Sequence, residues 1–418
     1  MTPGRGADRR AIVAVMSDAD VLRAERFPIG AATTLGELEG GDPHPLLARL
    51  RASEPVSWVP VLDGWLVTRR DLALDVMRDD RSFTVDDPRF TTARVVGPSM
   101  LSLDGSEHSR HRRPFTAPFK LDEVRRRLAP DVRAEAERLV AGLAPAGEAE
   151  LRRGFAGPLA AGVVCGLLGV ERGDVGPVLG WYDAIVGAVS DLSAGRPAAP
   201  DAGAAMRALG DALRPVLRSG GDKSLLAMAA GDASGLEESE IIANAAVLLF
   251  GGIETTEGMI ANAVLHLLSA PGALEVVRRD PGRLSDVVEE SLRLEPAAAA
   301  VDRYATADAR LGGADIAAGD LVRVSITAAN RDPGSFPDPD VFDCDRENAR
   351  RQLAFAGGPH VCVAMHLARL EAHVALDVLL KQLPGLRLDP GEPATVEGLI
   401  FRKPAALGVL WDAPATSG

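Results

Sequence analysis

The strongest structural restriction in this sequence is a cysteine near the C-terminus that follows a Gly-Gly-Pro turn. Residues 355–362 read FAGGPHVC, and Cys362 directly precedes residues 363–380, whose apolar positions recur near the helical period. A helix N-terminus stabilises negative charge, so a cysteine in its first turn is favoured as a thiolate. Gly357 and Gly358 lack a Cβ and let backbone N–H groups approach the sulfur. The pattern predicts a thiolate that binds a metal.

Cys362 nevertheless has two interpretations. Most free cysteines in cytosolic proteins are small buried apolar residues. As a ligand, Cys362 lacks the neighbouring Cys and His residues at short spacing that a structural zinc site needs. A single soft thiolate instead suits haem iron, where the porphyrin supplies four nitrogens and the protein one axial ligand. The residues favour the ligand interpretation but leave both open.

Composition limits the class of protein. A chain of 418 residues with 46% hydrophobic content can bury a large core, in one unit or in two to three domains. Three cysteines, Cys165, Cys344 and Cys362, indicate a reducing, cytoplasmic setting without a disulfide framework. The longest apolar runs, 160–170 and 245–250, are shorter than the roughly 18 residues of a membrane span. We therefore predict a protein that does not span a membrane.

The charge balance argues against nucleic acid as a partner. The net charge is −13, which repels a polyanion. A local basic cluster, Arg110, Arg112 and Arg113, runs against this balance. Its commonest meaning is a solvated helix face.

The distribution of apolar residues predicts a mainly α protein with small β-sheets. Residues 56–61 and 64–68 are typical of a hairpin, and 310–316 and 321–326 are β-like. Residues 83–103 have turn signals and little periodicity, which is typical of a functional segment. Helices are predicted at 72–78, 106–115, 121–143, 158–168, 180–190, 203–217, 237–268 and 284–294.

The longest predicted helix contains a segment that helices disfavour. Residues 251–256 read GGIETT, and each glycine costs about 1 kcal/mol relative to alanine inside a helix. Gly251 and Thr255 are four residues apart and share a face, so Thr255 points a hydroxyl to the space that Gly251 leaves open. A kink in which the hydroxyl bonds back to the chain explains the segment equally well.

Three motifs in this order resemble the soluble bacterial cytochrome P-450 haem-thiolate monooxygenases. They are ESLR at 290–293, NRDP at 330–333, and FAGGPHVC at 355–362 followed by LAR at 367–369. The resemblance covers nearly the whole chain. It implies a mainly α fold with small β-sheets and a long central helix over a haem. Residues 1–40 are expected to form a partly irregular extension, and 41–418 a single haem domain.

The resemblance also implies the cofactor, haem b, and the residues that hold it. Cys362 would be the axial thiolate ligand of the iron, and Phe355 would pack against the haem near the sulfur. Glu290 and Arg293 match a buried ion pair that, with Arg331 or its neighbours, would brace the haem-binding side. The haem propionates would accept hydrogen bonds from His108, Arg112, Arg303 and His360.

Two more sets of residues follow from the resemblance. Glu254 and Thr255 match the family's acid and alcohol pair, which delivers protons to dioxygen. The substrate pocket would be lined by residues of the long helix, of the segment after Arg293 and of the C-terminal region: Val247, Phe250, Gly251, Ala298, Val301 and Ile400. Ala356 and Ala364 replace glycines that are usual in the cysteine loop, and Gln352 replaces a frequent histidine.

The implied reaction inserts one oxygen atom from O₂ into a small apolar organic substrate, as in the tailoring of a secondary metabolite. Ferredoxin and ferredoxin reductase, as separate chains, would supply the electrons. A peroxide-driven peroxygenase is an alternative, although it does not need the proton relay of Glu254 and Thr255. A haem protein that senses a ligand without catalysis is the alternative from another class.

Overall fold

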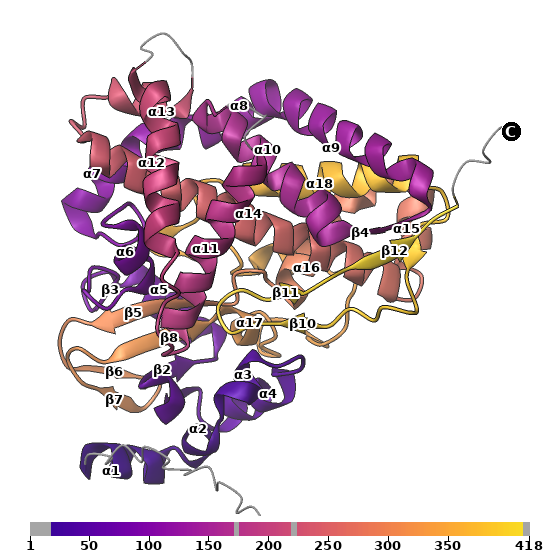
Figure 1. Ribbon diagram of the computed structural model, residues 1–418. Helices are drawn as coiled ribbons and strands as arrows, with labels where there is room; N and C mark the ends of the chain where they lie inside the picture. Colours follow the sequence, from indigo (N-terminus) through magenta and orange to yellow (C-terminus); the bar gives the residue numbers. More distant parts are fainter. Residues whose placement is uncertain (1–17, 171–174, 219–223, 413–418) are drawn as a thin grey trace, which may run out of the picture.

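A long helix, α14, runs through the middle of the chain, with other helices packed around it and a small sheet to one side (Figure 1). The computed structural model describes residues 18–170, 175–218 and 224–412. The N-terminal elements α1–α4 lie next to the sheet, while α9, α10 and α18 lie on the helical side. The predicted class, mainly α with small sheets, is confirmed.

The helices have the following bounds: α1 (Asp18–Arg26), α2 (Pro28–Ala32), α3 (Leu35–Glu39), α4 (His44–Ser53), α5 (Arg70–Arg78), α6 (Thr91–Val96), α7 (Gly105–Thr116), α8 (Leu121–Glu123), α9 (Ala129–Leu143), α10 (Gly157–Leu168), α11 (Val175–Ser193), α12 (Ala202–Arg218), α13 (Leu225–Ala230), α14 (Glu238–Ser269), α15 (Ala273–Arg279), α16 (Leu284–Leu294), α17 (Ile326–Ala329) and α18 (Met365–Gln382).

The main sheet has the strand order β1-β2-β8-β5-β3, and β2 and β8 are its parallel pair. Smaller sheets are formed by β6 with β7, by β10 with β11, and by β4, β12 and β9. The strands are β1 (Val56–Val59), β2 (Gly64–Val67), β3 (Phe83–Thr84), β4 (Glu148–Glu150), β5 (Ala300–Ala305), β6 (Ala309–Leu311), β7 (Ala314–Ile316), β8 (Leu321–Ser325), β9 (Arg387–Leu388), β10 (Val396–Glu397), β11 (Lys403–Pro404) and β12 (Gly408–Leu410).

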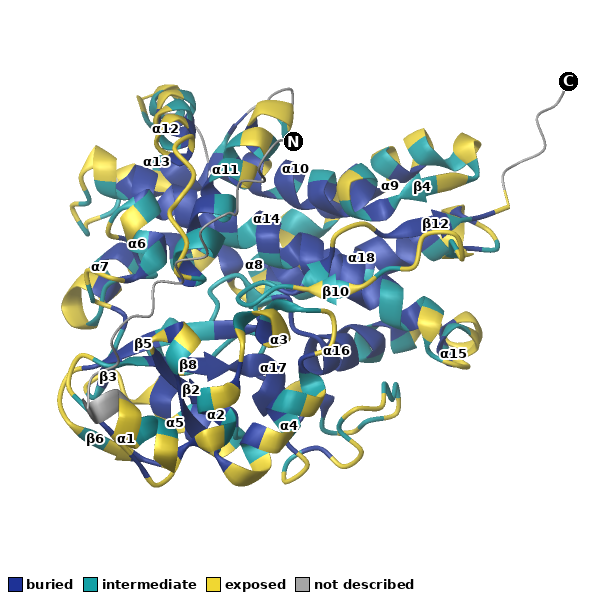
Figure 2. Cartoon of the chain, turned by 60° about the horizontal axis from the view of Figure 1, so that its bottom comes forward, coloured by how far each residue is buried: buried dark blue, intermediate teal, exposed yellow. Residues whose placement is uncertain are grey.

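The core sits around α14, which is mostly apolar and is buried on nearly all sides because α10, α16 and α18 pack against it (Figure 2). A helix that is apolar all round belongs in a protein interior. A second apolar cluster fills the space between the main sheet and α5, and includes Trp58, Trp65 and Phe83. The cavity described below lies where α14 passes between these two parts of the core.

Most predicted elements are confirmed, and the differences have local causes. The hairpin pairs Val56 with Val67, and α16 covers the predicted 284–294. The predicted helix 121–143 contains a π-helical turn at Val124–Leu128, next to Pro130, which has no N–H to donate to the helical ladder. The predicted strand 310–316 is divided into β6 and β7, because Gly312 and Gly313 both adopt positive φ.

The N-terminal region contacts the main sheet. Phe27 packs edge-on against Trp65 at 5.2 Å, and Arg23 pairs with Asp320 at 2.7 Å. The predicted boundary at residue 40 stays a prediction, and residues 1–17 of that extension lie outside the described residues. Within the described residues, no single helix is long and apolar enough to cross a membrane. Among those residues, only α14 and α15 taken together have the length and composition of a membrane span, and they are bent by 98° relative to each other.

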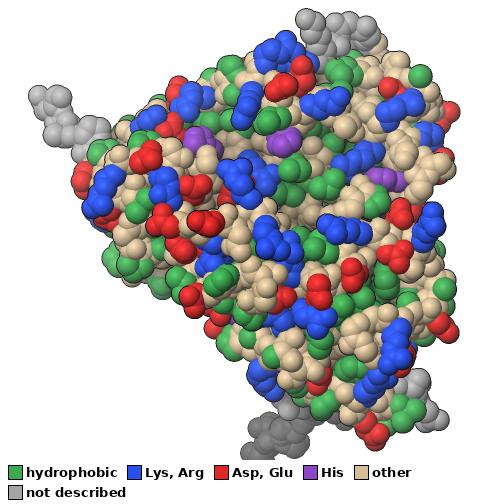
Figure 3. Space-filling model, turned by 180° about the vertical axis from the view of Figure 1, so that it is seen from behind, with side chains coloured by type: hydrophobic (Ala, Val, Ile, Leu, Met, Phe, Trp, Pro, Cys, Tyr) green, Lys and Arg blue, Asp and Glu red, His purple; other side chains and the backbone are tan. Residues whose placement is uncertain are grey.

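The surface opposite to that of Figure 1 carries many Lys and Arg side chains with Asp and Glu side chains between them (Figure 3). Among the ion pairs near the surface, Arg110 of α7 pairs with Glu240 and Arg113 with Asp232. Such exposed pairs contribute little stability, about 0–1 kcal/mol each.

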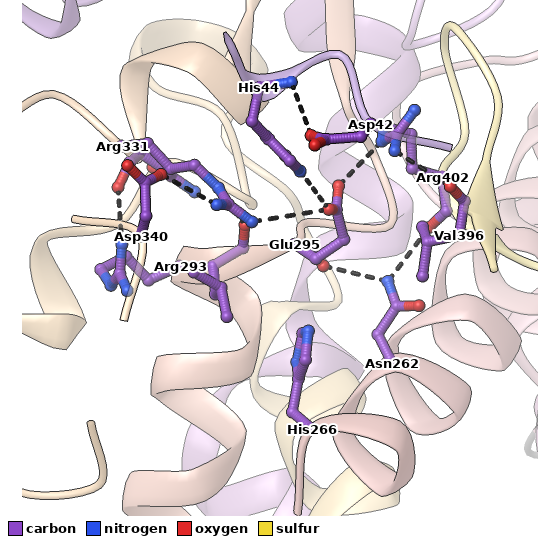
Figure 4. Close-up of polar contacts among 12 residues, drawn as sticks. Asp42, His44, Asn262, His266, Arg293, Glu295, Arg331, Asp340, Val396 and Arg402 are labelled. Atoms are coloured by element: carbon purple, nitrogen blue, oxygen red, sulfur yellow. Dashed lines mark hydrogen bonds and ion pairs between the residues drawn. The ribbon is translucent and has the colours of Figure 1, made fainter. Parts of the chain in front are cut away.

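A partly buried histidine at the C-terminal end of α14 predicts a pH dependence of stability. Burial lowers the pKa of His266 (Figure 4) to about 4, and its Nδ1 is 2.9 Å from the Ser291 hydroxyl. Because the unfolded pKa is near 6.5, this stability is complete above that pH and is lost as the pH falls toward 4. We expect the wild type to lose about 1–2 kcal/mol more than His266→Gln between pH 8 and pH 5, measured by guanidinium unfolding. An equal pH dependence of the two proteins would contradict this.

Candidate active site around Cys362

The cysteine loop lies between a one-turn helix, η9 (Gly358–His360), and α18. The helix begins at Met365, later than the predicted 363, so Cys362 precedes its first turn instead of belonging to it. The backbone N–H of Cys362 donates to the Phe355 carbonyl at 2.9 Å, which closes the loop on itself. The sulfur is thus held beside the N-terminus of α18 by the loop rather than by the helix.

Two residues with positive φ shape this loop. Gly358 has φ +68°, and a Cβ at this position would lie 2.2 Å from the Met77 carbonyl oxygen of α5, so only glycine fits. Ala356 has φ +57°, a conformation that costs an L-residue about 1–2 kcal/mol. The glycine that is usual in the family has no such cost, which is the physical effect of this departure.

The surroundings of the Cys362 sulfur have opposite effects on its pKa. Burial raises the pKa of Cys362, while the Ala364 N–H and the charges of Arg112 and Arg369 act to lower it. The protein alone therefore does not hold the free anion that the sequence predicted. A bound metal ion deprotonates a coordinating thiol outright, so the sulfur is suited to a metal rather than to a free thiolate.

Two buried basic side chains near this loop, Arg303 and His108, have no carboxylate partner among the described residues. Arg303 is only 4% exposed, and its guanidinium donates to the Asp302 carbonyl but pairs with no carboxylate of the described residues. His108 Nε2 is buried without a partner, and burial lowers the pKa of this histidine to about 4. The His108 ring lies 4.3 Å from that of His360, which bonds Asp104 at 2.7 Å. Buried donors of this kind fit a ligand that carries carboxylates, as haem does.

A cavity of about 300 Å³ joins the cysteine loop to α14. Its wall includes Cys362, Phe355, His360, Arg112, Arg303 and Thr255, and all six predicted pocket residues: Val247, Phe250, Gly251, Ala298, Val301 and Ile400. His108 and Glu254 do not line it. The wall also includes Thr91 and Thr92, which lie in the stretch 83–103 that the sequence indicated as a functional segment. What the sequence did not predict is that this part of the stretch is helical, because it lacks periodicity.

Thr255 keeps its hydroxyl at the cavity wall. Its Oγ1 donates to the Gly251 carbonyl oxygen at 2.6 Å, and nothing lies within 4 Å of the position of a Gly251 Cβ. Both sequence interpretations are therefore realised, because the hydroxyl bonds back to the chain beside an open space.

Glu254 lies apart from Thr255, although the two residues are adjacent in sequence. Neighbouring residues on a helix point in different directions, and the Glu254 side chain is buried on the far side of α14. Lys403 Nζ lies 2.8 Å from carboxylate oxygens of both Glu254 and Glu257, and the Tyr182 hydroxyl donates to both. No pattern in the sequence indicated this cluster, because Lys403 and Tyr182 come from segments far from Glu254 along the chain.

Glu290 and Arg293 form a buried, bidentate ion pair, with N–O distances of 2.7 and 2.8 Å. Its third member is Arg346, whose Nε lies 3.0 Å from Glu290, and not Arg331. Arg331 donates instead to the Leu294 carbonyl and to Asp340. Arg293 also donates to the carbonyls of residues 330, 339 and 341, so the pair fixes the irregular segment that leads to the cysteine loop.

The comparisons with known proteins agree with this geometry. The cytochrome P450 family model matches residues 283–392. Vitamin D(3) 25-hydroxylase of Pseudonocardia autotrophica is 34% identical over 90% of this chain and 94% of its own. Cytochrome P450 monooxygenase PikC of Streptomyces venezuelae is 35% identical over 92% and 94%. The chain belongs to the cytochrome P450 family. The crystal structure of CalO2 superposes with a TM-score of 0.82 at 30% identity, covering 89% of this chain and 96% of that one.

Family membership fixes the cofactor and the reaction class. This cytochrome P450 is a haem-iron monooxygenase that acts on an organic substrate and O₂. The buried donors around His108 and Arg303 and the sulfur of Cys362 fit haem in both charge and chemistry. Haem with a thiolate ligand supplies the activation of dioxygen, because the sulfur pushes electron density that favours O–O cleavage.

Proposed function

We propose that Cys362 is the axial ligand of the haem iron and that His108, Arg112, Arg303 and His360 hold its propionates. The observation that carries this proposal is the buried Arg303, which has no carboxylate partner among the described residues, on the same cavity wall as the sulfur. Arg112 supports it, because its guanidinium already reaches the Val361 carbonyl at 2.5 Å beside the cysteine. Phe355 packs near the sulfur, with the Arg369 guanidinium 4.4 Å from its ring centroid.

Proton delivery is assigned to Thr255 and Glu254. The Oγ1 hydroxyl of Thr255 holds a proton at the cavity wall, and the Glu254 carboxyl resupplies it from the other side of α14. Resupply requires Glu254 to leave Lys403 and Tyr182, since it does not line the cavity in this arrangement. Lys403 can remain paired with Glu257 when Glu254 leaves, so it does not become an isolated buried charge.

The substrate is proposed to be an apolar organic molecule larger than a single ring, and the reaction the tailoring of a secondary metabolite. The cavity wall opposite the cysteine loop is formed mainly by apolar side chains, among them Val247, Phe250 and Phe401. One relative is named for the 25-hydroxylation of vitamin D(3), which is consistent with a roomy site.

Ferredoxin and ferredoxin reductase are proposed as the electron donors. Arg113, next to Arg112 on α7, is exposed and could pair with an acidic partner in exchange for Asp232. Lys and Arg side chains are also spread over the face in Figure 3, although Asp and Glu lie between them. A cytoplasmic location, predicted from the sequence, stays a prediction.

Thr255→Ala tests the proposed proton delivery. With a plant-type ferredoxin system and a substrate chosen by its spectral shift, we expect product formation to fall by roughly 10²-fold, because the proton donor is lost. NADPH consumption should continue, and hydrogen peroxide should accumulate in place of product. Thr255→Ser, which keeps the hydroxyl, is the matched control and should retain coupled turnover. Coupled turnover by the alanine variant at the wild-type rate would remove Thr255 from the mechanism.

A further inference from the structure

The C-terminal wall of the cavity is a short loop between β10 and β11. Ile400 and Phe401 of this loop line the cavity, and the Phe401 ring contacts that of Phe250 edge-on at 5.5 Å. Two backbone hydrogen bonds tie the loop to the segment before β5: the Ala299 N–H donates to the Ile400 carbonyl at 2.8 Å, and the Arg402 N–H donates to the Ala297 carbonyl at 2.9 Å. Together they form the β-bridge between Ala298 and Phe401. These contacts fix where the loop lies but not how its turn is shaped.

The next residue, Arg402, does not line the cavity. Its side chain lies between Glu295 and Val396 (Figure 4). It is 2% exposed. Its guanidinium donates to the carbonyls of Gly398 at 3.0 Å and Val396 at 3.1 Å, which are the start of the same turn. Its backbone is also paired, because its N–H donates to the Ala297 carbonyl and its carbonyl accepts from Asn262 of α14 at 3.0 Å.

Glu295, at the end of α16, anchors this arginine. Its carboxylate accepts from Arg402 Nε at 2.8 Å and from His44 at 2.9 Å. Burial alone would raise the pKa of Glu295, yet the bond from His44 and the charges of Arg402, His44 and Arg331 lower it to about 2. The Glu295 carboxylate is therefore ionised at neutral pH. Both Arg402 and Arg331 pair with it, and Arg402 is closer, at 2.8 Å against 3.7 Å for Arg331.

The same guanidinium also reaches the N-terminal region. It donates to the carbonyls of Gly40 at 3.2 Å and Gly41 at 3.4 Å, and the Gly398 N–H donates to the Glu39 carbonyl at 2.8 Å. Arg402 thus joins four separate segments at one buried point: residues 39–44, the end of α16, α14 and the loop itself. A lysine has a single ammonium group and cannot reproduce this fork of donors.

We propose that Arg402 is a positioning residue that holds Ile400 and Phe401 in place and thereby sets the selectivity for large apolar ligands. Adjacent residues of an extended chain point to opposite faces, so an Arg402 side chain that is locked on the outer face fixes Phe401 on the cavity face. Ile400 is held differently, because the bonds from Arg402 to the Gly398 and Val396 carbonyls fix the turn that carries it. This inference rests on the proposed function, in that the wall formed by the loop contacts substrate. Arg402 itself touches neither the cavity nor the cysteine loop.

Binding of two azoles of different size tests the proposal. Imidazole needs only the iron, whereas clotrimazole also packs its aryl rings against the cavity wall. The haem-loaded full-length wild type, Arg402→Gln and Arg331→Gln would be titrated with each azole and followed by visible difference spectra. Arg331→Gln is the matched control, because Arg331 is also a buried arginine beside Glu295 but contacts Asp340 and Leu294 instead of the loop.

We expect Arg402→Gln to weaken clotrimazole by about 10-fold or more, the effect of losing well-packed apolar contacts, and to leave imidazole unchanged. Arg331→Gln should bind both azoles as the wild type does. Equal weakening of both azoles, or of neither, in Arg402→Gln would overturn the proposal, as would a selective loss in Arg331→Gln. If Arg402→Gln does not fold, Arg402→Lys replaces it and must show a smaller loss of the same kind. Failure of imidazole to bind the wild type would instead overturn the proposed haem site.

Discussion

Cys362→Ala is expected to yield protein that has lost the red-shifted Soret band of the reduced carbon monoxide complex and all monooxygenase turnover. Cys362 is the cysteine on the cavity wall, and no other Cys lines that wall. Within the described chain, no cluster of three His, Cys, Asp or Glu side chains offers an alternative metal site. The buried donors around Arg303 remain in this variant, so some haem is expected to bind without its thiolate ligand. Absorption spectra of the purified protein, with and without carbon monoxide, measure both effects.

Cys344→Ala is the control for this experiment. Cys344 is also a free, partly buried cysteine, and it lies outside the cavity. Burial raises the pKa of Cys344 to about 11, which keeps it a neutral thiol. Its replacement should leave the spectrum unchanged. A red-shifted band that persists in Cys362→Ala, or that disappears in Cys344→Ala, would refute the assignment of the ligand.

Glu290→Gln is expected to lower the free energy of unfolding by about 3–5 kcal/mol, because it leaves two buried cations without their carboxylate. Arg293 has a fully buried side chain, and Arg346 is almost as buried. Glu290 also accepts from the Asp343 N–H at 3.0 Å, so the irregular segment before the cysteine loop loses a second attachment. Guanidinium unfolding and the haem content of the purified protein measure the two consequences.

A double substitution separates the ion pair from general damage to the core. Arg293→Met combined with Glu290→Gln removes the more deeply buried cation together with its partner. We expect the combined change to cost clearly less than the sum of the two single changes, since a buried charge without a partner is the expensive state. Additive losses, or a loss below about 1 kcal/mol in Glu290→Gln, would show that the pair is not the main support of this segment.

Helices and strands with a regular pattern of apolar residues were predictable from the sequence. The apolar period placed α16 at its observed bounds, and the alternating apolar residues around residues 62–64 located the hairpin of β1 and β2. Local breaks in the regular pattern of apolar residues were not predictable in the same way. Pro130 interrupts the helical ladder, and two glycines in succession turn one predicted strand into β6 and β7. Helix α6 lacked a signal because its six residues, Thr91–Val96, are too few to show a helical period.

For the site, the sequence determined which chemical groups are present and in what order. The cysteine loop and the glycine-threonine segment of α14 follow from residue type and spacing, and the buried Glu290–Arg293 pair from the resemblance to the family. The tertiary structure alone decided which distant groups meet. In the folded chain Glu254 pairs with Lys403, and Glu290 pairs with Arg346 as well as with Arg293. Arg402 donates to the Gly398 carbonyl of the cavity loop. The physical reason is that a buried charge must find a partner wherever the packed chain supplies one, and spacing along the sequence does not encode that meeting.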